Sequence, residues 1–258
     1  MELSGRVALV TGGGSGIGRA TARRLADEGM QVCVADINGA AALSVAASIG
    51  GLGLAADMSD SDKVDEVFDR CIDAFGSVDL AYLNAGFSSV GGDLAILDNE
   101  NYRRALGINV DGVVFGARAA LRSMRAGRDR GDRAIIATAS AAGLDPFYPS
   151  PVYTLTKHAV VGFMRALGPD LAAEGIGVQT ICPGLTDTGM LPKEVKETLK
   201  RSGIPVISAE EIADAVVQAA RSPLSMSGTC WLCLPGKPPA PFEFNHASGP
   251  HDAINVHR

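Results

Sequence analysis

The chain has 258 residues, of which 47% are hydrophobic and only 5% are aromatic, and it contains 31 glycines. This composition excludes a largely disordered chain and suits a close-packed fold with small residues and tight turns. The net charge of −6 offers no general attraction to nucleic acid or to acidic membranes, so we expect a small-molecule substrate. Because no apolar run reaches the length of a membrane span, we expect a soluble, cytoplasmic protein.

Short apolar runs alternate with longer segments of helical spacing along most of the chain. The runs cover residues 7–10, 32–35, 52–55, 78–83, 134–137, 178–182 and 229–234. Strands that are buried on both faces appear as continuous apolar runs, and their alternation with helices implies parallel pairing through right-handed crossovers. The sequence therefore predicts an α/β chain with a single-domain doubly wound Rossmann fold, in which helices flank both faces of a parallel sheet of about seven strands.

The segment 235–241 breaks this alternation, because Pro-Gly-Lys-Pro-Pro-Ala-Pro can form neither a helix nor a central strand. We therefore assign residues 1–234 to the domain and residues 235–258 to a proline-containing C-terminal arm. Two interpretations of the arm stay open. It is either a loosely ordered terminus or an extended segment that docks Phe242 and Phe244 on a neighbouring subunit.

A glycine-rich turn, Thr11-Gly12-Gly13-Gly14-Ser15-Gly16-Ile17-Gly18, follows the first apolar run. Its pattern is Thr-Gly-x-x-x-Gly-x-Gly rather than Gly-x-Gly-x-x-Gly. Glycines let backbone amides approach a pyrophosphate, and a helix that begins at about Gly16 would turn its positive end toward that group. The turn therefore predicts dinucleotide binding, with a plain tight turn as the alternative.

Asp36 ends the second apolar run, 18 residues beyond Gly18. A carboxylate at this point can accept hydrogen bonds from both ribose hydroxyls of adenosine and would repel a 2′-phosphate. No lysine or arginine occupies positions 13–17 or 37–42 to bind such a phosphate. The sequence therefore favours NAD over NADP, and the alternative role for Asp36 is a helix N-cap.

Tyr153 and Lys157 lie four residues apart, a spacing that places them on one face of a helix. An ammonium group beside the tyrosine hydroxyl favours the phenolate, and a phenol that ordinarily has a pKa near ~10 then becomes a usable base. Together with the glycine-rich turn, the pair predicts proton transfer next to a bound dinucleotide.

With these motifs the chain resembles a short-chain dehydrogenase/reductase from residue 6 to about residue 234. The resemblance joins Asn109 and Ser140 to Tyr153 and Lys157 as a catalytic tetrad. It implies that Tyr153 is the general base, that Lys157 also holds the ribose, and that Ser140 donates a hydrogen bond to the substrate oxygen. It further implies that Asn109 bends its helix and anchors a water molecule.

The resemblance also implies a set of cofactor contacts. Asp57, with Met58 beside it, would contact the adenine ring, residues 84–86 (Asn-Ala-Gly) would line the cofactor, and residues 183–188 would lie under the nicotinamide. The expected cofactor-binding residues are Gly12, Ser15, Gly16, Ile17, Gly18, Asp36, Asp57, Met58, Asn84, Ala85, Gly86, Tyr153, Lys157, Pro183, Gly184, Thr186 and Thr188.

Substrate specificity is expected from the loops 87–94, 141–152 and 189–207, which follow the carboxyl ends of strands. The expected substrate-binding residues are Phe87, Ser140, Leu144, Phe147, Tyr148 and Met190. Such a mainly apolar pocket indicates a hydrophobic secondary alcohol or ketone. The cations Lys193, Lys196, Lys200 and Arg201 would either meet an acidic group or form the exposed face of a lid helix.

Two further patterns receive structural interpretations. The pair Cys230 and Cys233 has metal-like spacing, but residues three apart on a strand face opposite sides, and zinc would need a second pair. We therefore predict buried thiols and no metal. The basic stretch 118–133 is interrupted by acids and is read as a solvated helix end rather than as a polyanion site.

The sequence as a whole predicts an NAD-dependent alcohol dehydrogenase that interconverts a hydrophobic secondary alcohol and its ketone, with tyrosine as general acid/base. The alternatives are an NADPH-dependent ketone or 3-oxoacyl reductase and a non-catalytic dinucleotide-binding regulatory protein. Small residues at Ala159, Gly162 and Ala166 share one helix face, and the resemblance implies that a homodimer or homotetramer pairs there.

Overall fold

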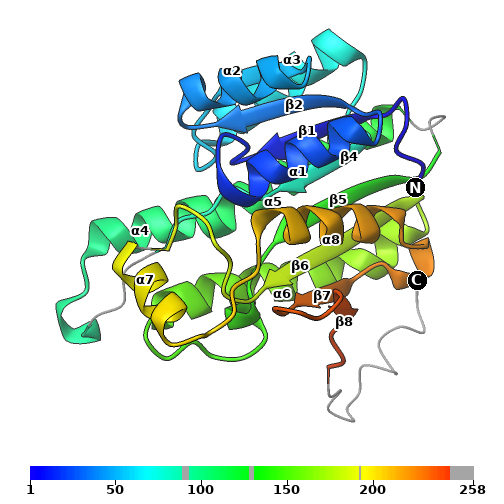
Figure 1. The fold of residues 1–258 in the computed structure, drawn as a ribbon. Helices are drawn as coiled ribbons and strands as arrows, with labels where there is room; N and C mark the ends of the chain where they lie inside the picture. The colour runs from blue at the N-terminus through cyan, green and yellow to red at the C-terminus, as the bar shows by residue number, and fades with distance from the viewer. Residues whose placement is uncertain (89–92, 128–130, 192, 245–258) are drawn as a thin grey trace.

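The computed structural model describes residues 1–88, 93–127, 131–191 and 193–244. Over these residues the strands form one eight-stranded sheet in the order β3-β2-β1-β4-β5-β6-β7-β8 (Figure 1). Strands β1 to β7 pair in parallel, and β8 pairs with β7 in the antiparallel sense. Their bounds are β1 Val7–Thr11, β2 Gln31–Asp36, β3 Leu52–Ala55, β4 Leu80–Leu83, β5 Arg133–Thr138, β6 Ile176–Pro183, β7 Thr229–Cys233 and β8 Ala240–Pro241.

The predicted doubly wound fold is confirmed. Every predicted apolar run overlaps one of the parallel strands, and all eight residues of β6 are buried. One face of the sheet is covered by α3 (Ser61–Phe75), α5 (Gly112–Ala126) and α6 (Pro151–Ala172). The other face is covered by α1 (Gly16–Asp27), α2 (Gly39–Ser48) and α8 (Ala209–Arg221).

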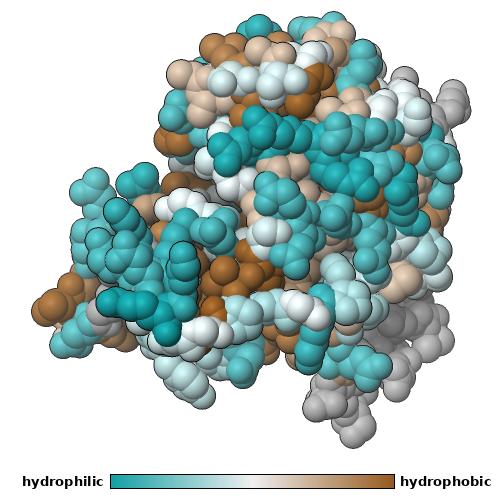
Figure 2. All heavy atoms as spheres, in the orientation of Figure 1, coloured by the Kyte–Doolittle hydropathy of each residue, from teal (hydrophilic) through white to brown (hydrophobic). Residues whose placement is uncertain are grey.

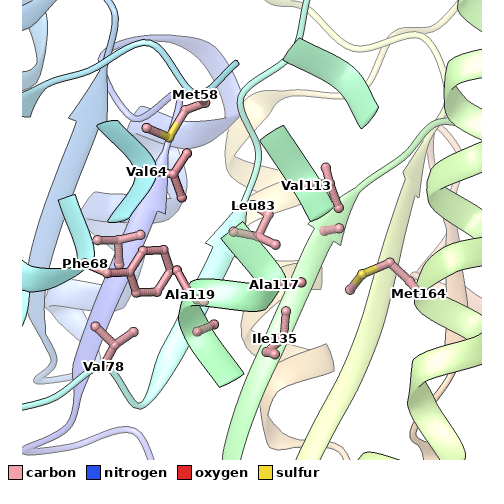
Figure 3. Close-up of a cluster of buried hydrophobic side chains, with 14 of the residues drawn as sticks. Met58, Val64, Phe68, Val78, Leu83, Val113, Ala117, Ala119, Ile135 and Met164 are labelled. Atoms are coloured by element: carbon pink, nitrogen blue, oxygen red, sulfur yellow. The ribbon is translucent and has the colours of Figure 1, made fainter. Parts of the chain in front are cut away.

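Two hydrophobic cores lie on the two faces of the sheet. Figure 3 shows the core under α3, α5 and α6, where Phe68, Leu83 and Ile135 pack together from a helix and two strands. Cys230 belongs to this core, whereas Cys233 belongs to the core on the opposite face. The five cysteines are buried free thiols, so the prediction of structural cysteines is confirmed.

Two short helices, α4 (Asn99–Leu106) and α7 (Lys193–Arg201), extend beyond the carboxyl ends of the strands (Figure 1). Parallel strands that meet at a reversal of strand order leave a crevice at their carboxyl ends. In this sheet the reversal falls between β1 and β4. The candidate site therefore belongs at this edge. No helix of the described residues is long and apolar enough to cross a membrane.

The beginning of the C-terminal arm belongs to the sheet. Phe242 donates its backbone N–H to the carbonyl of Cys230 at 2.8 Å, directly after β8. The rings of Phe242 and Phe244 meet edge to face with centroids 4.9 Å apart, and the Arg165 guanidinium lies 3.5 Å from the Phe244 centroid. Both rings pack on this chain's own core, so residues 240–244 belong to the fold, and docking on a neighbouring subunit stays a prediction. Residues 245–258 lie outside the described part of the chain.

Candidate active site

The glycine-rich turn is shaped by glycines that have no room for a side chain. A β-carbon at Gly18 would lie 2.1 Å from the carbonyl oxygen of Gly12, and Gly12 itself has a φ of +62°. Helix α1 begins at Gly16, as predicted, and its N-cap Ser15 makes no side-chain capping hydrogen bond. The amides of this first helical turn are thus suited to an anion, and the turn fits a pyrophosphate. Ile17 packs its side chain inward toward α8.

Asp36 connects the end of β2 to this turn. One of its carboxylate oxygens accepts the backbone N–H of Gly14 at 2.9 Å, and the other accepts that of Asn38 at 2.9 Å. The side chain of Asn38, not of Asp36, caps α2 by accepting the N–H of Ala41 at 3.1 Å. The alternative role of Asp36 as an N-cap is therefore wrong, and its carboxylate faces the glycine-rich turn.

Asn84 holds the turn from the neighbouring strand. Its Nδ2 donates to the carbonyl of Thr11 at 3.2 Å and to that of Gly12 at 3.4 Å. The hydroxyl of Thr11 accepts the backbone N–H groups of Asn84 at 2.9 Å and Ala85 at 3.1 Å. The amide of Asn84 therefore shapes the site by binding protein backbone. Thr11 was not predicted as a site residue, although a polar residue that ends an apolar strand is a signal for one.

The side chains of Asp57 and Met58, the two residues expected near the adenine ring, have different surroundings in the structure. One carboxylate oxygen of Asp57 accepts the N–H of Ser59 at 2.9 Å and its hydroxyl at 2.7 Å. Met58 is 5% exposed, and its side chain points into the core toward Val64 (Figure 3). The Met58 side chain therefore lies in the core under α3 and α5, and a cofactor contact of Met58 stays a prediction for its main chain.

Residues 183–188 bring the end of β6 to the glycine-rich turn. Gly184 donates its N–H to the carbonyl of Cys233 at 2.9 Å, and the hydroxyl of Thr186 donates to the carbonyl of Gly184 at 3.0 Å. The side chain of Thr188 would lie 3.3 Å from a β-carbon placed at Gly16. Segments that are far apart in the sequence thus meet at the carboxyl edge, as predicted.

Helix α6 carries Tyr153 and Lys157 on one face, as their spacing predicts. The Lys157 Nζ lies 5.5 Å from the centroid of the Tyr153 ring and donates to the carbonyl of Thr138 at 3.0 Å. Ser140 accepts the N–H of Ala142 at 3.1 Å and also hydrogen-bonds Tyr153. The structure therefore brings together Ser140, Tyr153 and Lys157. Thr138, which sequence reasoning missed, lies among them.

Asn109 lies in a π-helical turn, Gly107–Asp111, between α4 and α5. This irregular turn agrees with the helix bend that the resemblance implied. The Asn109 side chain accepts the backbone N–H of Phe87 at 2.7 Å and donates to the Phe87 carbonyl at 2.8 Å. It also donates to the hydroxyl of Thr156 on α6 at 3.1 Å. Asn109 therefore positions Phe87 relative to the helix that carries Tyr153.

Burial controls the electrostatics of this group. Burial raises the pKa of the Tyr153 phenol, and the hydrogen bond with Ser140 partly lowers it. Burial lowers the pKa of Lys157 to about 8. The Lys157 ammonium donates to the carbonyl of Thr138, and the phenolate is expected to depend on Lys157 together with the positive charge of the oxidised nicotinamide. An additional positive charge bound nearby is needed to favour the phenolate.

The low pKa of Lys157 predicts a pH-dependent stability. Because the pKa is about 8 in the folded protein against 10.5 for an ordinary lysine, the unfolded chain binds more protons between these pH values. The free energy of unfolding therefore rises with pH across this interval, by at most about 3 kcal/mol. In chemical denaturation, we expect Lys157→Met to be more stable than the wild type at about pH 7 and to lose this advantage by about pH 10.

The exposed Lys237 provides the control for this experiment. Lys237→Met removes an exposed ammonium, and its free energy of unfolding is expected to show the pH dependence of the wild type. A constant difference between Lys157→Met and the wild type across the interval would contradict the assigned pKa.

The predicted substrate residues differ in their placement. A β-carbon at Gly86 would lie 3.6 Å from the Asn109 Oδ1 and 3.8 Å from the Met190 Cε, which places Met190 at the site. Phe87 also lies at the site, because its backbone is hydrogen-bonded to the side chain of Asn109. Leu144 packs against the core, and Phe147 and Tyr148 are 47% and 86% exposed. The predicted loop residues 89–92 and 192 lie outside the described part of the chain.

Helix α7 contains no buried residue, and Lys196 pairs with Asp187 at 2.6 Å. Figure 2 shows hydrophilic residues over α7 and hydrophobic atoms exposed between it and α8. These observations favour the interpretation of the four cations of α7 as the exposed face of a lid helix over their interpretation as a site for an acidic group.

The basic stretch 118–133 is largely neutralised within the chain. Arg118 and Arg122 pair with Asp65, and Arg125 pairs with Glu174 at 2.7 Å. Arg128 and Arg130 lie outside the described residues. The partners support a solvated surface rather than a polyanion site.

Comparisons with known proteins agree with this geometry. A family model described as short chain dehydrogenase matches residues 6–199. The chain is 37% identical over 195 residues to a 2,5-dichloro-2,5-cyclohexadiene-1,4-diol dehydrogenase of Sphingobium indicum, covering 74% of this chain and 77% of that protein. It is 33% identical over 206 residues to the human 15-hydroxyprostaglandin dehydrogenase, whose name specifies NAD(+), covering 76% and 74%.

Among solved structures, the chain resembles a 3-ketoacyl-(acyl-carrier-protein) reductase from Brucella melitensis complexed with NADH. The TM-score is 0.82 at 29% identity, and the match covers 89% of this chain and 97% of that one. The residues that meet at the carboxyl edge of the sheet are thus found in a chain that matches this family in both sequence and structure. The chain belongs to the short-chain dehydrogenase family of oxidoreductases.

Proposed function

We propose that this protein is an NAD-dependent dehydrogenase that interconverts a hydrophobic secondary alcohol and its ketone. The observation that carries the proposal is the group formed by Ser140, just past β5, and two residues of α6, in which Tyr153 hydrogen-bonds Ser140 one helical turn from the buried Lys157. A phenol next to a hydroxyl donor and an ammonium is suited to proton exchange with an alcohol oxygen. A bound nicotinamide dinucleotide supplies the chemistry of accepting or donating a hydride.

Each residue of this group has a distinct task. Ser140 donates a hydrogen bond to the substrate oxygen and fixes it beside Tyr153. Tyr153 takes the proton from the alcohol in oxidation and returns it to the carbonyl oxygen in reduction. Lys157 binds the ribose hydroxyls and contributes positive charge beside the phenol. Asn109 acts on these residues through Thr156 and Phe87.

The preference for NAD rests on Asp36. Its carboxylate lies at the glycine-rich turn, held by the N–H of Gly14, where an adenosine ribose would approach. A negative charge at this point accepts hydrogen bonds from ribose hydroxyls and repels a 2′-phosphate. The names of two of the similar proteins, which specify NAD(+) and NADH, support the same preference.

The proposed substrate class rests on the apolar residues near Asn109. Met190 provides hydrophobic surface beside Gly86 and Asn109, and the ring of Phe87 lies under the Arg104 guanidinium, 4.4 Å from the ring centroid. The cyclic diol and the hydroxyprostaglandin named for two relatives are alcohols on hydrophobic skeletons. An NADPH-dependent ketone or 3-oxoacyl reductase is the second candidate, favoured by the name of the similar solved structure.

The proposed function is tested by NADH formation with purified protein at alkaline pH, using a panel of cyclic and acyclic hydrophobic secondary alcohols. We expect turnover with NAD and much slower turnover with NADP. A preference for NADP would favour the reductase. Binding of NAD without turnover of any alcohol or ketone in the panel would favour a non-catalytic dinucleotide-binding protein.

Replacing Asp36 by Asn tests the cofactor preference separately. The amide keeps an acceptor for the N–H of Gly14 but removes the charge, so we expect the ratio of kcat/KM for NAD over NADP to fall about tenfold or more. Steady-state kinetics with both cofactors provides the measurement. Asp73→Asn, on the exposed side of α3, is the control and should leave the ratio unchanged. An unchanged ratio in Asp36→Asn would rule out the assigned role.

A further inference from the structure

Three polar side chains form a continuous row of hydrogen bonds behind the glycine-rich turn. Tyr82 on β4 is fully buried, and its hydroxyl lies 2.7 Å from the hydroxyl of Thr138 at the end of β5. The same Thr138 hydroxyl lies 3.0 Å from the Oδ1 of Asn84. Polar groups at this depth are costly unless each is satisfied, so the row needs a structural or functional reason.

The chemistry of the three groups gives the row one direction. The Nδ2 of Asn84 is identified by its two carbonyl acceptors, on Thr11 and Gly12, so its Oδ1 faces Thr138 and can only accept. Thr138 has a single hydroxyl proton and must donate it to Asn84. It therefore accepts from Tyr82. Burial raises the pKa of Tyr82, so this phenol stays protonated and remains a donor.

The row ends at the backbone that would bind the dinucleotide. A β-carbon at Gly12 would lie 3.2 Å from the Asn84 Nδ2, and one at Gly18 would lie 2.7 Å from it. The amide is thus enclosed by the two glycines. Thr138 also accepts the Lys157 ammonium through its carbonyl at 3.0 Å. One residue therefore contacts both the support of the turn and the lysine of the catalytic group.

We propose that Tyr82 and Thr138 are positioning residues, which orient the Asn84 amide against the glycine-rich turn and thereby set the affinity for the dinucleotide. The inference rests on the proposed function for the ligand it names. Without the Thr138 hydroxyl, the Oδ1 of half-buried Asn84 loses this donor, and the amide is free to rotate away from the Gly12 carbonyl. The turn then loses its preorganised shape.

Thr138→Val tests the proposal, with Thr180→Val as a matched control. Thr180 lies on the adjacent strand β6 and is fully buried, and its hydroxyl interacts with the thiol of Cys230 rather than with a member of the row. Both substitutions exchange a hydroxyl for a methyl group. We expect the Kd for NADH to rise about fivefold to tenfold in Thr138→Val, the effect of about one hydrogen bond, and to stay unchanged in Thr180→Val.

Tyr82→Phe completes a double-mutant cycle. Alone, it should weaken NADH binding less than Thr138→Val, because Thr138 can still donate to Asn84. Combined with Thr138→Val, it should add no further loss, because the row is already broken at Thr138. Additive losses would show that the two hydroxyls act independently and would overturn the row as a unit.

Hydrogen–deuterium exchange of residues 11–18 gives a readout that is independent of turnover. Faster exchange in Thr138→Val than in Thr180→Val is expected, because the turn is less firmly held. If Thr138→Val has a lower Tm but the NADH affinity and exchange of the wild type, the hydroxyls are structural and the proposal is wrong. If the wild type does not bind NADH, the proposed function fails, and the exchange of residues 11–18 alone then decides whether the row positions the turn.

Discussion

Tyr153→Phe is expected to reduce the rate of alcohol oxidation by about a hundredfold to ten-thousandfold, the range observed when a positioned general acid/base is lost. The variant lacks the hydroxyl oxygen of Tyr153 and keeps its aromatic ring on α6. Because the lost atom hydrogen-bonds Ser140 and lies outside the glycine-rich turn, NADH affinity should change little. Initial rates of NADH formation and NADH titration by fluorescence provide the two measurements.

Tyr102→Phe is the matched control, because Tyr102 lies on α4, carries the same hydroxyl and is not among the residues expected to bind cofactor or substrate. Its rate should equal that of the wild type. A Tyr153→Phe variant that kept its turnover would show that another group moves the proton. Equal losses of turnover and of NADH affinity would instead indicate that the variant distorts the cofactor site.

Gly18→Ala is expected to abolish measurable NADH binding and to lower the Tm. A β-carbon at this position would lie 2.1 Å from the carbonyl oxygen of Gly12 and 2.7 Å from the Nδ2 of Asn84. The first contact is with backbone, so the turn itself must move. Overpacking of this kind costs about 1–3 kcal/mol of stability or more. A displaced turn would also misdirect the amides of α1.

Gly177→Ala is the control, since it introduces the same methyl group on β6 at a place where the nearest atoms, the carbonyl oxygen of Arg133 and the side chain of Leu224, lie 3.7 Å away. Both distances are ordinary van der Waals contacts, so this variant should be about as stable as the wild type and should bind NADH normally. Differential scanning calorimetry and NADH titration measure both effects. Normal NADH affinity in Gly18→Ala would contradict the close contact between Gly18 and Gly12.

The local sequence pattern predicted the fold and the outline of the site. Each predicted apolar run became a parallel strand because burial on both faces of a sheet selects continuous apolar residues. Helix α1 began at Gly16 and Asp36 ended β2, as their positions in the motifs predicted. Tyr153 and Lys157 share a helix face because their spacing matches the helical repeat. Each of these properties depends on residues that are close in the sequence.

Other features depended on packing that the sequence does not reveal. The Met58 side chain lies in the core under α3 and α5. The phenylalanines of the arm pack on their own chain, where β8 extends the sheet by one antiparallel strand. Burial raises the pKa of Tyr153, and the ammonium of Lys157 donates to the carbonyl of Thr138.

By itself, then, the sequence determined the alternation of strands and helices, the glycines that leave the turn open, and the pair of residues suited to proton transfer. The tertiary structure decided how these parts are held. Tyr82, Asn84 and Thr138 come from two strands and meet only because β4 pairs with β5. Hydrogen-bond partners and burial depend on which distant segments become neighbours in the folded chain, and local sequence patterns do not contain that information.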